Sequence, residues 1–103
     1  MRYDNPAEFE VIAVATSESQ GPELRVQLHA ATLIDGGRFL FRAEPRLWET
    51  DLRFQLLRSG CVDPVDLEAA TTQLSSGETA RFKMTCPPQD LIDMGFSGIN
   101  RVH

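Results

Sequence analysis

The fold of this chain is decided mainly by the stretch Leu24-Arg-Val-Gln-Leu-His-Ala-Ala-Thr-Leu-Ile-Asp-Gly-Gly-Arg-Phe-Leu-Phe41. From Leu24 to Ala30, apolar residues alternate with polar ones, which is typical of a β-strand with one buried face. Asp35-Gly36-Gly37 then supplies residues that tolerate positive φ, as a tight hairpin turn requires. Phe39 and Phe41 resume the apolar alternation. The stretch therefore predicts an antiparallel hairpin.

Three further segments show the same two-residue period. In residues 8–15, Phe9, Val11 and Ala13 alternate with Glu10, Ile12 and Val14, so both faces carry apolar side chains. This pattern predicts a strand with both faces at least half covered. Residues 52–56 place Leu, Phe and Leu at every second position, and residues 79–85 do the same with Ala, Phe and Met. Pro87-Pro88 stops the latter strand, because proline cannot donate to a ladder. The mostly polar residues 43–51 between these segments predict a surface loop.

One helix is predicted from Pro64 to Leu74. Asp63 is suited to the N-cap, Pro64 to the first helical position, and Asp66 to the positive end of the helix dipole. One apolar face then follows at helical spacing: Leu67, Ala70, Thr71 and Leu74. Strands followed by one late helix predict an α+β domain spanning residues 1–103, in which a bent antiparallel β-sheet wraps one short α-helix.

Composition narrows the range of partners. Fifteen acidic and ten basic residues give a net charge of −5, and the basic residues are scattered along the chain. A phosphate backbone is repelled by such a surface, so we expect no nucleic-acid partner. No apolar run approaches the roughly 18 residues of a membrane span, and the first residues lack an apolar signal segment. These features favour a cytoplasmic protein without membrane contact.

Cys61 and Cys86 are the only cysteines. They form no Cys-x-x-Cys pair, and neither His29 nor His103 lies at a metal-ligand spacing from them, so the sequence predicts no metal and no cofactor. Free cysteines pack like small hydrophobic residues, so we expect both thiols to be reduced and partly buried. Cys61 precedes the predicted helix and Cys86 ends the following strand. We therefore expect them to be unbridged, since a disulfide needs Cα atoms within about 7 Å.

Residues 24–95, or 72 of the 103 residues (95 − 24 + 1), resemble an FKBP-type peptidyl-prolyl isomerase domain. The resemblance rests on the ordered set of hairpin, strand, short helix with a Ser-Ser-Gly-Glu turn, further strand and Cys-Pro-Pro loop. It implies an FKBP-like fold with an apolar pocket between sheet and helix. FKBP domains also close with a long strand that the end of this chain, Val102-His103, does not show. We expect that strand to be absent, to be truncated because the chain is part of a larger protein, or to be replaced by Phe9–Ala15 in a rearranged order.

The resemblance also implies which residues line the pocket. Phe39 and Val62 match the family, whereas Leu67 stands where the family has its floor tryptophan and His29 where it has a tyrosine. Most of the other pocket positions depart as well. The full set of pocket candidates is His29, Phe39, Leu40, Leu52, Cys61, Val62, Leu67, Ile92 and Met94. The simplest structural roles for these residues are core packing on the strands and helix, with His29 at a surface or rim.

Three functions are compatible with this pattern. The first is a non-catalytic FKBP-like module that binds a protein partner, such as a chaperone or neighbouring domains. The second is a weak prolyl isomerase, and the third a small acidic binding protein of other ancestry. An apolar pocket must be open to catalyse isomerisation, so a filled pocket opposite Leu67 favours the module. Trp48, in a polar segment, is either an anchor beneath a loop or an exposed protein contact.

Overall fold

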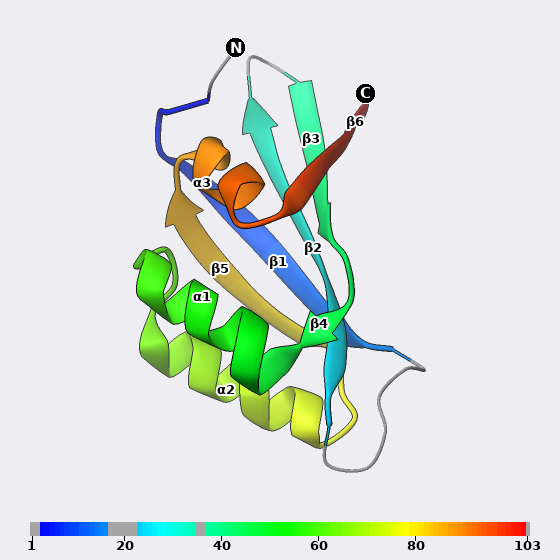
Figure 1. Cartoon of the computed structure of the whole chain (residues 1–103). Helices are drawn as coiled ribbons and strands as arrows, with labels where there is room; N and C mark the ends of the chain where they lie inside the picture. Colours follow the sequence, from blue (N-terminus) through cyan, green and yellow to red (C-terminus); the bar gives the residue numbers. More distant parts are fainter. Residues whose placement is uncertain (1–2, 17–22, 35–36, 103) are drawn as a thin grey trace.

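The computed structural model describes residues 3–16, 23–34 and 37–102. Its elements are β1 (Ala7–Ala15), β2 (Arg25–Ile34), β3 (Gly37–Ala43), β4 (Arg46–Leu47), η1 (Trp48–Leu52), α1 (Arg53–Ser59), α2 (Pro64–Ser75), β5 (Ala80–Cys86), α3 (Pro88–Asp93) and β6 (Phe96–Val102). Here η1 is a π-helical segment that leads directly into α1. The helices gather on one face of a twisted sheet (Figure 1).

The sheet has six strands in the order β5-β1-β2-β3-β6, with β4 paired to β2. All pairings are antiparallel. The predicted hairpin is confirmed as β2–β3, in which Thr32 lies opposite Phe39, although its turn residues 35–36 lie outside the described residues. β1 occupies an interior position between β5 and β2. The α+β class predicted from the sequence is therefore confirmed.

Among the described residues, the helices cover one face of the sheet. Alternate residues of β1 and β5 point toward the helices and are buried, and α2 packs against them through Leu67, Ala70 and Leu74. The opposite face, called here the outer face, is open to solvent and carries the exposed side chains of Val14, Leu33 and Leu40. An antiparallel sheet can remain half solvated in this way because each strand alternates between its two faces.

The helix α2 begins as the sequence predicts. The Asp63 carboxylate accepts a hydrogen bond from the backbone N–H of Val65 at 2.8 Å, and Pro64 occupies the first helical position. The helix extends to Ser75, one residue beyond the predicted end, and Gly77 follows with a φ of 81°. A left-handed glycine after the last turn is a common helix stop.

The predicted strand at residues 52–56 is wrong, because this segment is helical. Leu52 ends η1, whereas Phe54 and Leu56 belong to α1. Leu52 and Leu56 are four residues apart, so both face the core on one side of a helix, while Phe54 points away and is 57% exposed. The predicted loop at residues 43–51 is also partly wrong, since it contains β4 and most of η1.

The expectation of a single helix is wrong as well. The described residues form three α-helices, and the segment after Pro87 is not a loop but α3, with Pro88 at its first position. None of the helices in these parts of the chain combines the length and apolar character needed to cross a membrane.

The described chain ends with a further strand, β6, that the sequence did not predict. β6 pairs with β3 at the edge of the sheet, with a register shift between Leu40 and Phe41. Its segment, Phe96-Ser-Gly-Ile-Asn-Arg-Val102, lacks the two-residue apolar alternation of a half-buried strand. Sequence alternation therefore gave no sign of it.

Candidate functional site

The strands β1 and β2 separate at one end of the sheet. Their pairing stops at Glu10 and Ala31, although β1 extends back to Ala7 and β2 continues to Ile34. Across the gap, the Thr32 hydroxyl donates a hydrogen bond to the backbone carbonyl of Glu8 at 2.9 Å. Figure 1 shows the two strands diverging toward α3. The sheet thus forks where these strands leave each other.

A shallow groove of about 670 Å³ lies at this fork. Its lining residues are Pro6, Ala7, Glu8, Glu10, Ala31, Thr32, Leu33 and Lys83. The apolar part includes Leu33, whose side chain is 73% exposed, and the charged part carries two carboxylates and one ammonium group. We call this feature the fork groove. It offers an apolar contact beside a surplus of negative charge.

The charges at the fork groove are held loosely. Lys83 Nζ lies 3.2 Å from Glu8 Oε1, and Arg81 Nη1 lies 3.1 Å from Glu10 Oε1. All four side chains are mostly exposed, and such pairs stabilise a fold by only about 0–1 kcal/mol. Their carboxylates can therefore exchange a cation of the chain for a cation of a partner at small cost.

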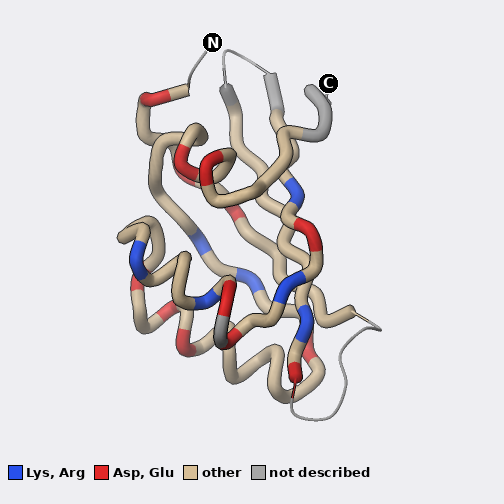
Figure 2. Tube along the Cα trace, viewed as in Figure 1, with Lys and Arg blue, Asp and Glu red and all other residues tan. Residues whose placement is uncertain are grey.

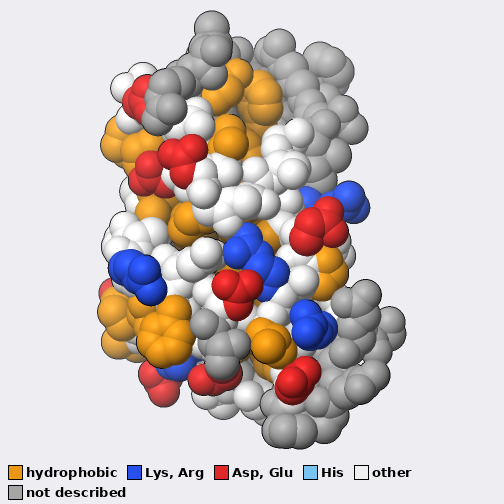
Figure 3. Space-filling model, in the orientation of Figure 1, with side chains coloured by type: hydrophobic (Ala, Val, Ile, Leu, Met, Phe, Trp, Pro, Cys, Tyr) orange, Lys and Arg blue, Asp and Glu red, His pale blue; other side chains and the backbone are white. Residues whose placement is uncertain are grey.

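The helical face offers smaller hollows. One, of about 260 Å³, lies between α1 and α3, and another, of about 440 Å³, follows the exposed side of α2 from Pro64 to Thr72. Apolar and charged side chains are interspersed over this face (Figure 3). Acidic residues lie on α2, on α3 and in the turn before α1 (Figure 2). The fork groove is thus larger than either of these hollows.

Four of the pocket candidates lie in the hydrophobic core. Leu52, Cys61, Val62 and Leu67 are at most 6% exposed and belong to one cluster beneath the sheet. The space opposite Leu67 is therefore filled by other core side chains, and no solute can reach it in this conformation.

The other five candidates are dispersed. His29 and Leu40 lie on the outer face, where His29 is opposite Ile12 and Arg42. The remaining three lie elsewhere: Phe39 half-buried on β3, Ile92 exposed on α3, and Met94 half-buried after α3. The nine candidates are consequently divided among the core, the outer face and the region of α3.

Trp48 is a core residue. Its side chain is fully buried, and its ring packs edge-on against Phe82 with centroids 6.4 Å apart. The indole N–H donates a hydrogen bond to Thr71 Oγ1 at 2.8 Å, and that hydroxyl donates to the carbonyl of Leu67 at 2.9 Å. The alternative that Trp48 is an exposed protein contact is wrong, because η1 places its side chain between α2 and the sheet.

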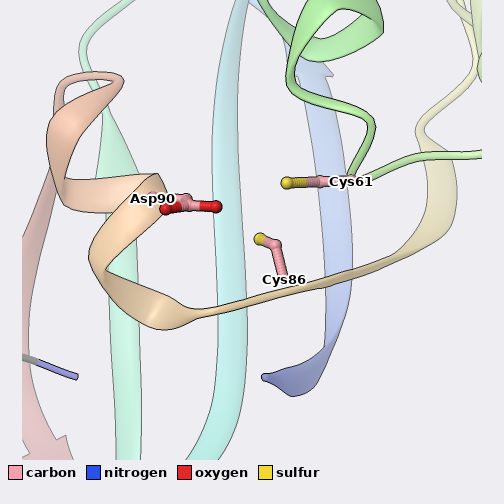
Figure 4. A group of neighbouring side chains, drawn as sticks. All are labelled: Cys61, Cys86 and Asp90. Atoms are coloured by element: carbon pink, nitrogen blue, oxygen red, sulfur yellow. The ribbon is translucent and has the colours of Figure 1, made fainter. Parts of the chain in front are cut away.

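A second cluster combines two thiols and a carboxylate. The side-chain ligand atoms of Cys61, Cys86 and Asp90 all lie within 4.8 Å of one another, and the three side chains point toward a common centre (Figure 4). Both cysteines are free and buried. The prediction that they are unbridged is confirmed. The separation on which it was based is wrong, because the backbone N–H of Thr85 donates to the carbonyl of Cys61 at 2.9 Å and aligns Cys61 with the end of β5.

The environment of Cys86 disfavours its thiolate. Burial raises the pKa of the Cys86 thiol above its ordinary value, and the hydrogen bond with Cys61 and the charges of Cys61 and Asp90 raise it further. Cys86 is therefore a neutral thiol at neutral pH. The spacing of cysteine and histidine in the sequence does not indicate this cluster. Its one sequence signal is Cys86-Pro-Pro-Gln-Asp90, in which the aspartate follows the last residue of the strand by four positions.

Comparison of the chain with protein-family models, with curated proteins and with solved structures found no match. The likeness to FKBP domains therefore rests on the sequence motifs alone.

Proposed function

We propose that this domain is a protein-interaction module that binds its partner in the fork groove. The observation that carries the proposal is the open, partly apolar groove on the uncovered face of the sheet, lined by Leu33 and Ala31. Exposed apolar side chains framed by polar ones are characteristic of protein contact sites. The core candidates of the prolyl pocket, by contrast, have no access to a ligand.

Charge defines the partner further. The fork groove carries Glu8 and Glu10 against Lys83, and the whole chain has a net charge of −5. Complementary potential raises the association rate and excludes partners of the same sign. The occupant we propose is a protein segment with an apolar anchor residue next to a basic residue, whose cation replaces Lys83 or Arg81 at a carboxylate.

The FKBP-like ancestry is part of this proposal, as a degenerate and non-catalytic member that links a chaperone or neighbouring domains. A cytoplasmic location also belongs to it, because reducing compartments keep buried thiols such as Cys61 and Cys86 free. The alternative, a weak isomerase, is supported by the retained Phe39 and Val62. Isomerisation needs an apolar pocket that favours the twisted amide, and the floor residue Leu67 is inaccessible.

A protease-coupled isomerase assay separates the two functions. We expect activity to be absent or at least about 100-fold below that of an active FKBP domain, equivalent to about 2.7 kcal/mol of lost transition-state stabilisation. Activity within tenfold of an active domain, abolished by substituting Phe39, would instead support the enzyme.

Binding is tested with a random peptide library displayed against the folded domain, followed by NMR titration of the selected peptides. We expect selected sequences to combine an apolar residue with a basic neighbour and to shift resonances of the fork groove. Leu33→Asp should weaken binding by at least about tenfold, or 1.4 kcal/mol. The matched control is Val65→Asp, because Val65 is 75% exposed but lies on α2.

Both variants replace a highly exposed leucine or valine, so the far-UV circular dichroism of each should equal that of the parent. Equal binding by the parent and Leu33→Asp, or a loss confined to Val65→Asp, would place the contact elsewhere and contradict the proposal.

A further inference from the structure

Three segments that are distant in the sequence bring two thiols and a carboxylate together. Cys61 belongs to the α1–α2 connection, Cys86 is the last residue of β5, and Asp90 lies in the first turn of α3. Their ligand atoms lie within 4.8 Å of one another and converge on one point (Figure 4). We propose that Cys61, Cys86 and Asp90 bind one Zn²⁺ ion, a site independent of the fork groove.

The spacing of the donors suits zinc. Zinc binds cysteine sulfur at about 2.3 Å and carboxylate oxygen at about 2.0–2.2 Å, so tetrahedral geometry places neighbouring donors about 3.5–3.8 Å apart. The observed limit of 4.8 Å requires a contraction of at most about 1.3 Å. Rotation of side chains can provide that much movement. Three protein ligands leave the fourth zinc position to a water molecule or another small donor.

Donor type also selects the metal. Thiolates favour soft or borderline ions such as zinc, whereas magnesium and calcium prefer sites made of oxygen atoms. Two thiolates and a carboxylate carry three negative charges, which a divalent cation reduces to one. Cysteine binds the ion as thiolate, so zinc binding displaces the thiol protons, and the cation offsets most of the charge that the deprotonated ligands carry.

Packing alone does not explain the position of the Asp90 carboxylate. Buried cysteines alone are explained as small hydrophobic residues. Asp90, however, turns its carboxylate toward the two sulfur atoms, and within residues 3–16, 23–34 and 37–102 no basic side chain pairs with it. A cation at the centre of the cluster would supply the missing partner.

The backbone around the cluster is already fixed. The backbone N–H of Cys61 donates to Ser59 Oγ at 3.2 Å, and its carbonyl accepts from Thr85. On the other side, the N–H of Asp90 donates to the carbonyl of Pro87 at 2.9 Å. These contacts hold both sides of the site in place, so that binding has little backbone ordering to oppose it.

The test uses the full chain without a histidine tag, reduced and stripped of metal by a chelator. Zn²⁺ is titrated in competition with a chromophoric chelator, and Co²⁺ serves as a spectroscopic probe. We expect one ion per chain and a thiolate-to-cobalt charge-transfer band that Cys61→Ser and Cys86→Ser each abolish. Asp90→Asn should weaken zinc binding by at least the roughly tenfold that follows loss of a supporting group.

Asp93→Asn is the matched control, since Asp93 also lies on α3 but pairs with Gln89 at 3.1 Å, and its affinity should equal that of the parent. If a serine variant fails to fold, the Asp90 and Asp93 variants alone decide the question. The proposal is overturned if zinc does not bind the reduced protein, if Asp90→Asn binds as tightly as Asp93→Asn, or if the cobalt band persists without the cysteines. Purification of the protein as a stable Cys61–Cys86 disulfide that reductant cannot convert to a zinc-binding form would also overturn it.

Discussion

Removing the Thr71 hydroxyl should show how much the hydrogen bond between Trp48 and Thr71 contributes to the free energy of unfolding. In the folded protein the buried indole N–H donates to Thr71 Oγ1 at 2.8 Å. Thr71→Val keeps the shape of the side chain but leaves that N–H without an acceptor. An unsatisfied buried donor costs about 1–3 kcal/mol, so we expect the free energy of unfolding to fall by that amount.

A double-mutant cycle isolates this hydrogen bond from other effects. In a Trp48→Phe background the donor is already gone, so Thr71→Val should cost about 1 kcal/mol less than it does in the parent. The remaining cost reflects the lost bond from Thr71 Oγ1 to the carbonyl of Leu67 at 2.9 Å. The difference between the two backgrounds is the coupling energy of the indole and the hydroxyl.

Urea unfolding of the four proteins provides the measurement. Far-UV circular dichroism must be the signal, because Trp48 is the only tryptophan and its fluorescence disappears in two of the variants. Additive effects of the two substitutions, with a coupling energy near zero, would refute the assignment of Trp48 as a hydrogen-bonded core residue. Equal m-values across the four proteins are the control for unchanged two-state unfolding.

Three further outcomes are expected. Gly95→Ala should destabilise more than Gly77→Ala in thermal melts: both residues have positive φ, but only at Gly95 would a Cβ meet Arg46 Nη2, at 2.8 Å. Equal melting temperatures of the two variants would contradict this, because they would show that the Arg46 side chain moves away from the added Cβ at little cost. In the presence of chelator and reductant, the free energy of unfolding of the parent should fall above about pH 8.5, by up to about 1.4 kcal/mol per pH unit. In this range the Cys86 thiol ionises in the unfolded chain, whereas its raised pKa keeps it protonated in the folded protein. Urea titrations should find a smaller slope in Cys86→Ala, and identical slopes would contradict the stated environment of the thiol. Leu67→Asp places an unpaired charge in the core and should lower stability by several kcal/mol, about the cost of such burial, whereas a variant that melts like the parent would contradict the packing of α2.

Local chemistry was enough to predict several elements. The hairpin β2–β3 follows from the two-residue alternation and the Asp-Gly-Gly turn, and α2 follows from the cap at Asp63 and the apolar face that includes Leu67. These signals are readable because each lies within one segment. The side-chain period of a helix or strand follows from the backbone geometry of that element alone.

Periodicity was ambiguous where a pattern fitted two structures. Leu52 and Leu56 satisfy both the spacing of a strand and that of one helix face, and only packing against the core selected the helix. The edge strand β6 shows no apolar alternation in its sequence, so only its pairing with β3 identifies it. In both cases tertiary contacts decided what the local sequence left open.

The sequence by itself determined the α+β class, the half-open sheet and the acidic surface, because alternation and net charge are properties of the chain alone. The tertiary structure decided which functional groups meet. Cys61 and Cys86 are far apart in sequence, and only the bond from Thr85 to Cys61 and the turn into α3 bring them to Asp90. The fork groove likewise exists only because β1 and β2 part after Glu10 and Ala31. Contacts between distant segments depend on how the whole core packs, which no single segment encodes.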